Sequence, residues 1–169
     1  VGISSQAVLD FLDALELGEA EPHSLMILRH GKVCVEGWWK PYAPGLRHGM
    51  QSFTKTLVAT AIGIAFTQGR LDLEERLVDL FPDRLPAEPG ENLRKLTIRH
   101  LLAMASGAEK VPTFDGDWIR NFLELDFVHE PGTAFYYNSV GSTLLGAILQ
   151  RKTGQNVQEF LTAELYPYI

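Results

Sequence analysis

The sequence predicts an α/β protein of the α+β type that is mostly helical and carries an N-terminal β-hairpin. Two short β-like runs flank His30-Gly31, and about six segments with helical spacing follow them. Two strands do not complete a sheet, because an isolated hairpin is only marginally stable. We therefore expect residues 1–169 to form a single, incomplete domain, with the remaining strands of the sheet outside this sequence.

The N-terminal segment is predicted to hold one helix and the hairpin. The helix is expected to start at Ser4 or Ser5, and Gly18 stops it after a run of apolar residues at helical spacing. The runs 25–28 and 33–39 then alternate as strands do, with the glycine-containing turn between them.

A long apolar helix is predicted from Ser52 to Gln68, after a loop at 40–50 that contains two prolines and two glycines. Gly69 is placed to close this helix. Because the run is apolar nearly all round, we expect the helix to be buried on every side.

The remaining chain is predicted to form short helices separated by loops. A helix is expected to open at the acidic residues 71–74, and a proline-containing surface loop to cover 82–95. Thr97 can cap the next short helix. Three further helices are expected at 118–125, 139–151 and 157–165, with Trp118 packing at the start of the first rather than lining a cleft.

Composition narrows the classes of function. A net charge of -6 and a pI near 5.3 argue against nucleic acid as a partner, and one cysteine excludes an internal disulfide framework. The five histidines show no metal-ligand spacing and no phosphate-binding glycine loop is visible, so we expect no metal and no cofactor. No signal peptide or membrane span is visible, which leaves the compartment open with the cytoplasm favoured. The oligomeric state is also open.

Ser52 and Lys55 are the first candidates for chemistry. Residues three apart lie on the same face of a helix, so the hydroxyl and the amine become neighbours. A lysine one turn into an apolar helix is partly desolvated, which favours the neutral amine that can activate a serine. The alternative is an N-cap serine followed by a solvent-facing lysine, and Ser-x-x-Lys alone does not separate the two.

Several segments together resemble the penicillin-recognising serine hydrolases, which include class C β-lactamases, DD-peptidases and related esterases and amidases. Ser52-Phe53-Thr54-Lys55 resembles the first motif of this family. Residues 24–39 resemble its opening hairpin, and 96–107 (LTIRHLLAMASG) its helix that ends in a Ser/Thr-Gly turn. Residues 131–139 (PGTAFYYNS) resemble the segment around its Tyr-x-Asn motif. The resemblance covers essentially the whole chain and implies the β-lactamase/DD-peptidase-like fold.

The resemblance implies an acyl-enzyme mechanism on an amide, ester or β-lactam-type carbonyl of a small-molecule or peptide-like substrate. Ser52 would be the nucleophile, Lys55 the general base and Tyr137 the proton shuttle, with Tyr136 as a one-residue alternative. Ser139 occupies the position where the family commonly has asparagine, and Asn138 lies between. Both are expected to bind substrate.

The family's third motif, Lys-Thr-Gly or His-x-Gly, lies on a late strand and brings the second oxyanion-hole donor. Lys152-Thr153-Gly154 matches it literally but falls at a predicted helix end, where a basic turn and a glycine are ordinary capping. We therefore expect the third motif outside this sequence. Because loss of one such donor costs about 10²–10³ in rate, the chain alone is expected to be weak or inactive. The alternative is a non-catalytic fragment of the same fold, used for binding or sensing.

Overall fold

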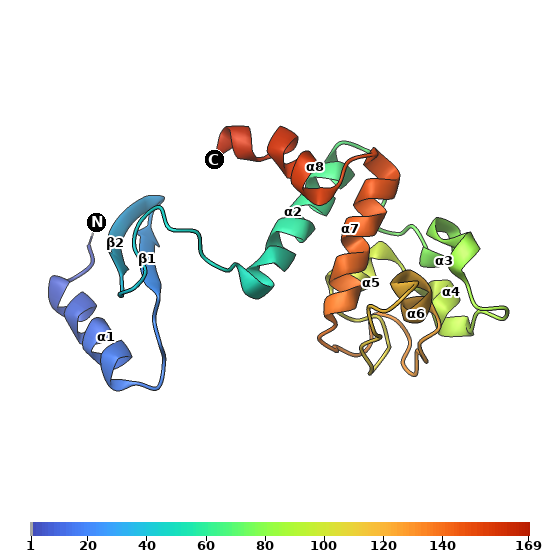
Figure 1. Cartoon of the computed structure of the whole chain (residues 1–169), viewed down its shortest axis with the longest axis horizontal. Helices are drawn as coiled ribbons and strands as arrows, with labels where there is room; N and C mark the ends of the chain where they lie inside the picture. The colour runs from blue at the N-terminus through green and yellow to red at the C-terminus, as the bar shows by residue number, and fades with distance from the viewer. Residues whose placement is uncertain (1) are drawn as a thin grey trace. The chain divides into compact units, whose positions relative to one another are not determined.

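The computed structural model describes residues 2–169, which form two compact units, Val1–Gly49 and Met50–Ile169 (Figure 1). The expected single domain stays a prediction. The described chain is mostly helical with one two-stranded antiparallel sheet, as the sequence predicts. Among the described helices, none is both long and apolar enough to cross a membrane.

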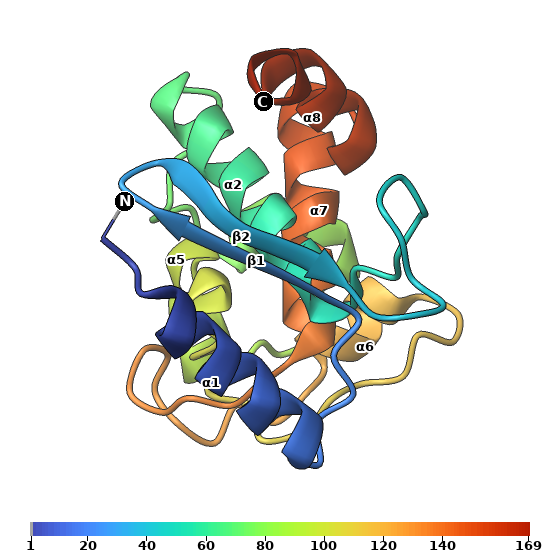
Figure 2. The ribbon, with the colours of Figure 1, turned by 90° about the vertical axis from the view of Figure 1, so that its left-hand side faces the viewer.

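The first unit consists of helix α1 (Ser5–Leu17) and a hairpin of β1 (Ser24–Arg29) and β2 (Lys32–Trp38), which Figure 2 shows side by side. The strands pair antiparallel, with a register shift between Ile27 and Leu28. His30 and Gly31 both have positive φ, 51° and 71°, as the two central residues of a tight hairpin turn require. The predicted helix and hairpin are confirmed.

Three rings hold the loop after β2 against the residue that precedes β1. His23 stacks on Tyr42 with ring centroids 4.0 Å apart, and its Nδ1 lies 2.7 Å from Nε2 of His48. The second nitrogen of His48 lies 3.0 Å from the carbonyl oxygen of Gly49. The proline-containing loop at 40–50 is therefore tied down by aromatic and polar contacts, without regular structure.

The second unit is built around α2 (Thr54–Thr67), which follows a short 3₁₀ turn, Gln51–Phe53. Helices α7 (Ser139–Thr153) and α8 (Val157–Glu164) pack against α2. Gly69 has a φ of 70° and lies two residues beyond the end of α2, as expected.

The expectation that α2 is buried on every side is wrong for the described chain. Ala61, Ile62 and Ala65 are fully buried, whereas Phe66 is 45% exposed and Gly63 is also exposed. The helices α7 and α8 thus cover only part of the apolar surface of α2. One face joins the core, and the other lies open.

The other elements of this unit are short: α3 (Leu77–Leu80), η2 (Pro82–Arg84), α4 (Glu91–Lys95), α5 (Ile98–Leu102), α6 (Trp118–Leu123) and η3 (Tyr166–Tyr168). Two predictions need correction. The helix expected at 71–74 begins only at Leu77, because the backbone N–H of Asp72 bonds the carboxylate of Glu75 in a turn. The expected loop at 82–95 contains η2 and α4, because buried Leu93 draws α4 into the core.

Thr97 and Gly154 lie at helix termini as predicted, whereas Ser4 precedes α1 without a side-chain cap bond. Thr97 precedes α5, and its backbone N–H donates to Nδ1 of His100 at 3.1 Å. Partial burial lowers the pKa of His100, which favours the neutral imidazole that this acceptor role requires. Gly154 closes α7 in the left-handed conformation, so Lys152-Thr153-Gly154 is a helix end in the structure.

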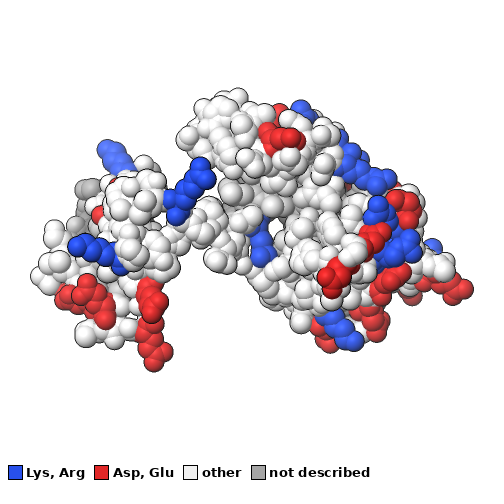
Figure 3. Space-filling view, viewed as in Figure 1, with Lys and Arg blue, Asp and Glu red and all other residues white. Residues whose placement is uncertain are grey.

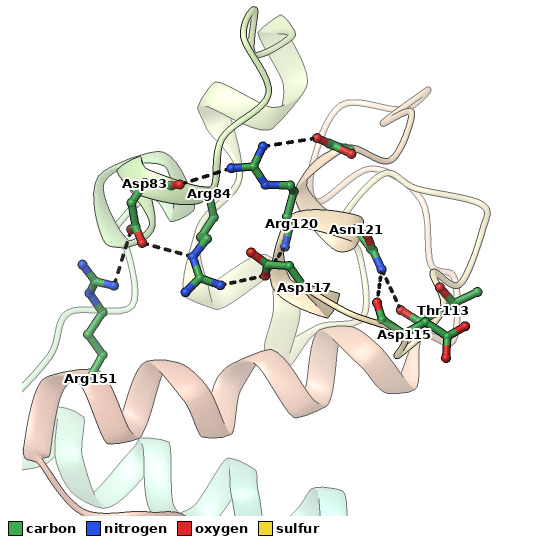
Figure 4. A network of polar contacts seen from close by, with 9 residues as sticks. Asp83, Arg84, Thr113, Asp115, Asp117, Arg120, Asn121 and Arg151 are labelled. Carbon is green, nitrogen blue, oxygen red and sulfur yellow. Dashed lines mark hydrogen bonds and ion pairs between the residues drawn. The ribbon is translucent and has the colours of Figure 1, made fainter.

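A polar network fastens α6 and the end of α7 to η2 (Figure 4). Arg84 binds Asp83 at 3.1 Å and Asp117 at 2.7 Å, and Asp83 also lies 3.8 Å from Arg151 of α7. Asp117 caps α6 by accepting the backbone N–H of Arg120. Because these side chains are partly exposed, the network contributes orientation more than stability.

A close backbone crossing joins the segment after α5 to the segment before α7. Gly107 has a φ of 92°, and a Cβ placed there would lie 2.2 Å from the carbonyl oxygen of His129. The backbone N–H of His129 donates to the carbonyl of Gly107 at 3.1 Å, so the two segments cannot separate to make room without losing this bond. Only glycine fits this position without strain.

We predict that Gly107→Ala lowers the free energy of unfolding by about 2–5 kcal/mol, because backbone strain and a steric clash add. Urea unfolding of the two proteins measures this difference. Gly63→Ala is the matched control: a Cβ there meets nothing within 4 Å, and alanine should stabilise α2 by about 0.5–1 kcal/mol. Equal stability of Gly107→Ala and the parent chain would contradict the crossing.

Candidate active site

Ser52 and Lys55 lie at the N-terminal end of α2. Ser52 is in the 3₁₀ turn and Lys55 is in the first turn of the helix, and Nζ of Lys55 donates a hydrogen bond to Oγ of Ser52 at 3.2 Å. Gln51, directly before Ser52, has a φ of 46°, an uncommon value for a residue with a side chain. The structure therefore brings the predicted pair together at a strained turn.

Tyr137 joins this pair from the segment that leads into α7. Its hydroxyl donates to Oγ of Ser52 at 2.7 Å, and Nζ of Lys55 lies 5.0 Å from the centre of its ring. The backbone of Tyr136 instead bonds the carbonyl of Met104 at 2.9 Å. Of the two candidate tyrosines, Tyr137 is the one whose hydroxyl reaches the serine.

Asn138 directly follows Tyr137 and caps α7. Its Oδ1 accepts the backbone N–H groups of Val140 and Gly141 at 3.0 and 3.1 Å, which caps α7. Its Nδ2 donates to the carbonyl of Lys110 at 3.2 Å, and the residue is only 4% exposed. We expected Asn138 to bind substrate, but both ends of its amide are occupied by protein. Its observed contacts are the α7 cap and Lys110, and we propose that they position the adjacent Tyr137.

The electrostatics of the cluster act on Tyr137. Hydrogen bonds with Lys55 and then with the Ser52 hydroxyl lower the pKa of the Tyr137 phenol. Desolvation opposes them, and the Lys55 charge and the Ser139 hydroxyl make smaller lowering contributions. A lowered phenol pKa means that the phenoxide forms at a lower pH than in a free tyrosine. The cluster thus holds a serine hydroxyl beside a phenol whose pKa is lowered.

A groove of about 470 Å³ opens beside Lys55, between α2, α7 and the start of α8. Ser139 and Trp118 both line it, so Trp118 packs at the start of α6, as expected, and also lines this groove. Sequence reasoning missed Ser142 and Gly146, which line the groove as well. Their spacing of three and seven residues from Ser139 places all three on one face of a helix and was the available signal.

No group of three or more metal-ligating side chains is found within residues 2–169. The chemistry that the cluster offers comes from Ser52, Lys55 and Tyr137.

A family model described as Beta-lactamase matches residues 19–168. "Probable fimbrial assembly protein FimD, serogroup H1" of Dichelobacter nodosus is 28% identical over 144 residues, which cover 74% of this chain and 36% of that protein. "Protein flp" of Staphylococcus aureus strain MW2 is 27% identical over 169 residues, which cover 88% of this chain and 33% of that protein.

The fold is shared with a solved structure of D-alanine carboxypeptidase AmpC from Burkholderia cenocepacia. The TM-score is 0.75 at 19% identity, and the match covers 97% of this chain and 48% of the other. The predicted β-lactamase/DD-peptidase-like fold is therefore confirmed. The chain spans about a third of the length of the curated relatives it matches.

We predict that Tyr137 ionises below the ordinary tyrosine pKa of about 10. The near-ultraviolet absorbance of phenoxide, compared between the chain and its Tyr137→Phe variant, measures this group alone. Lys55→Met should move the titration back toward higher pH, because the hydrogen bond with Lys55 is the main cause of the shift. Tyr136→Phe is the control and should leave the low-pH component in place. A Tyr137 titration that ignores Lys55→Met would contradict this electrostatic assignment.

We predict that Asn138→Ala lowers the free energy of unfolding by about 1–2 kcal/mol, because α7 loses its cap. The same variant should raise the pKa of Tyr137, since the tyrosine is no longer held against Lys55. Asn138→Asp keeps the acceptor oxygen and should retain most of the stability. An Asn138→Ala protein that matches the parent in both urea unfolding and phenoxide titration would remove the positioning role.

Proposed function

This chain belongs to the beta-lactamase family. We propose that it is the part of a serine hydrolase that carries the catalytic nucleophile. The reaction is acyl transfer through an acyl-enzyme, with an amide, ester or β-lactam-type carbonyl as the point of attack. One observation carries the proposal: Oγ of Ser52 accepts hydrogen bonds from both Lys55 and Tyr137, at 3.2 and 2.7 Å. A serine with a solvent-facing lysine, the alternative reading of the motif, has no reason to meet a tyrosine from the far part of the chain.

In the first step Oγ of Ser52 bonds to the carbonyl carbon while its proton moves to the Lys55–Tyr137 pair. The lowered pKa of Tyr137 supports a route in which Tyr137 first loses the proton that it donates to Ser52 and its phenoxide, beside Lys55, then accepts the serine proton. The sequence instead predicts Lys55 itself as the general base. Both routes need both residues, but only the first requires the tyrosine oxygen to take the proton.

In the second step the tetrahedral intermediate collapses, the bond to the leaving group breaks, and the leaving group takes the proton back from the pair. Water then attacks the acyl-enzyme by the same route in reverse, which releases the acid and restores Ser52. The N-terminal end of α2 favours negative charge at Oγ of Ser52 as its proton leaves, before the charge passes to the carbonyl oxygen of the substrate.

The rate of the isolated chain is a separate part of the proposal. The family resemblance puts the second oxyanion donor on a strand that is not within residues 1–169. Loss of one such donor costs about 10²–10³ in rate, so the chain alone should turn over esters far more slowly than a longer natural protein that contains it. Comparable rates for the two proteins would overturn this part.

We predict that a fluorophosphonate probe adds covalently to Ser52 in the natural protein that carries this chain. Intact-mass measurement should show one adduct, which disappears in Ser52→Ala. Ser5→Ala, which removes an exposed hydroxyl in the first unit, is the matched control and should keep the adduct. Absence of any adduct in the parent protein would favour the non-catalytic alternative.

We predict that Lys55→Ala and Tyr137→Phe each slow acylation by about 10²–10⁴, the usual contribution of general acid–base groups, while the fold stays intact. Tyr136→Phe should acylate normally. The rate of adduct formation, followed by mass, provides the measurement, and circular dichroism checks the fold. Normal acylation by Lys55→Ala would remove lysine from the mechanism. Normal acylation by Tyr137→Phe would leave Lys55 as the base.

A further inference from the structure

We propose that His100 is a positioning residue for Tyr137 and that it acts only while its imidazole is neutral, so that mild acid slows the reaction. The inference rests on the proposed acyl-transfer function and adds its regulation by pH. Three features carry it: an uncommon helix cap, the packing of the imidazole ring, and a line of backbone hydrogen bonds that leads to Tyr137.

The cap at the start of α5 uses a histidine where a capping box commonly uses glutamate or glutamine. Helix α8 has the common form, in which the carboxylate of Glu159 accepts the backbone N–H of Asn156 at 2.9 Å. In α5 the acceptor is Nδ1 of His100, and the backbone N–H of Thr97 donates to it at 3.1 Å. A ring nitrogen accepts only while it carries no proton, so this cap exists only on the neutral ring.

Protonation of His100 turns the acceptor of the cap into a donor. Both nitrogens of an imidazolium carry hydrogen, so Nδ1–H would face the backbone N–H of Thr97. The Thr97 hydroxyl, 3.0 Å from Nδ1, can accept the new proton, but the backbone N–H then loses its acceptor. Thr97 is only 7% exposed, which leaves water little access. A buried donor without a partner opposes the folded arrangement.

Burial favours the neutral ring of His100. Burial is the largest influence and lowers the pKa of His100, whereas the Glu74 carboxylate raises it and Arg99 lowers it. Glu74 and Arg99 form an ion pair with each other, so their effects on the ring oppose. The pKa of His100 therefore lies below the ordinary histidine value of about 6.5, and the cap is formed above that pH.

The segment that faces His100 brings charges of both signs. Glu130 pairs with Lys95 at 3.2 Å, and Nε2 of His129 lies 2.7 Å from the Glu109 carboxylate. Figure 3 shows acidic and basic side chains interspersed over the α3 and α4 side of the unit. Protonation of His129 would strengthen its contact with Glu109. Of the two histidines in residues 50–169, His100 is therefore the one whose protonation breaks a contact.

The ring and the backbone of His100 both contact the segment 129–136. The Cδ2–Nε2 edge of the ring lies against Gly132, where an added Cβ would be 3.3 Å from either atom. The carbonyl of His100 accepts the backbone N–H of Ala105 at 2.9 Å, and the carbonyl of Ala105 accepts that of Gly132 at 2.8 Å. The cap of α5 and the turn at Gly132 therefore share one residue.

The same pairing continues to Tyr137. The carbonyl of Met104 accepts the backbone N–H of Tyr136 at 2.9 Å, and the next residue is Tyr137, whose hydroxyl lies 2.7 Å from Oγ of Ser52. Loss of the α5 cap loosens the helix end that holds this pairing. The tyrosine then spends less time at the serine, which slows attack without any change in the reacting groups.

The test compares the natural protein that carries this chain with His100→Gln and His100→Ala, in reaction with a fluorophosphonate. The bond from Ser52 Oγ to phosphorus forms, fluoride leaves, and the serine proton passes to the Lys55–Tyr137 pair. Glutamine keeps an acceptor at every pH, alanine has none, and the parent has one only while His100 is neutral. At about pH 8, His100→Gln should react within about threefold of the parent, and His100→Ala about 10-fold more slowly.

The ratio of the His100→Gln rate to the parent rate isolates the histidine, because both proteins share the titration of Lys55 and Tyr137. This ratio should be constant above about pH 6.5 and rise about 10-fold toward about pH 5, as the parent loses its cap. His129→Gln is the matched control and should follow the parent at every pH. If His100→Gln does not fold, His100→Asn replaces it, since its side-chain oxygen also cannot be lost to protonation.

Hydrogen exchange of the peptides that cover 129–137 measures the loosening without any chemistry. After correction for the intrinsic effect of pH, protection of these peptides should fall in acid in the parent and in His129→Gln, and stay constant in His100→Gln.

The outcomes separate the two proposals. A constant rate ratio, or a rising ratio without loss of protection, would overturn the role of His100 and leave the serine hydrolase standing. An acid effect that His129→Gln removes would overturn it as well. Absence of any adduct at every pH would overturn the proposed function, and with it the effect on the reaction, even where protection falls. A rising ratio together with lost protection, both abolished by His100→Gln, supports both proposals.

Discussion

The hydroxyl of Ser52 is hydrogen-bonded by side chains from two separate parts of the second unit. It accepts hydrogen bonds from Lys55, three residues away, and from Tyr137, 85 residues away. The first contact follows from the helix alone, whereas the second exists only if α2 and α7 pack in one particular arrangement. Buried residues of both helices, among them Ile62 and Leu144, belong to the same core cluster. The core therefore sets the geometry of the cluster, and a slip of one helix against the other would separate serine from tyrosine.

A second constraint acts through the backbone that delivers Tyr137. The segment 104–107 forms hydrogen bonds with the segment 129–136, through Met104 and Tyr136, Ala105 and Gly132, and Gly107 and His129. Asn138 then fixes the start of α7. Tyr137 therefore lies between the hydrogen-bonded segment 129–136 and the capped start of α7, which limits where its hydroxyl can lie. Pre-organisation of this kind removes conformational freedom before a substrate arrives.

Much of this arrangement could be predicted from local sequence signals. The hairpin turn, the apolar spacing of α7 and α8, and the closing glycines Gly69 and Gly154 all depend on neighbouring residues, and the structure has them where expected. Two of the errors arose where distant contacts decide. α4 forms because Leu93 reaches the core, and α2 keeps an open face because its neighbours cover only part of it. Asn138 caps the α7 backbone, which a local capping rule can predict, but its bond to Lys110, 28 residues away, follows from no spacing rule.

The position of Lys55 has a consequence for energetics as well as for chemistry. Its side chain borders the groove on one side and Tyr137 on the other. Whatever occupies the groove changes the hydration of the same cation that lowers the pKa of the phenol. Occupancy and proton release are therefore thermodynamically linked, and the linkage is reciprocal. A ligand that prefers the phenoxide form tenfold lowers its pKa by about one unit, which corresponds to about 1.4 kcal/mol. The pKa of Tyr137 therefore depends on whether the groove is occupied as well as on the residues around the phenol.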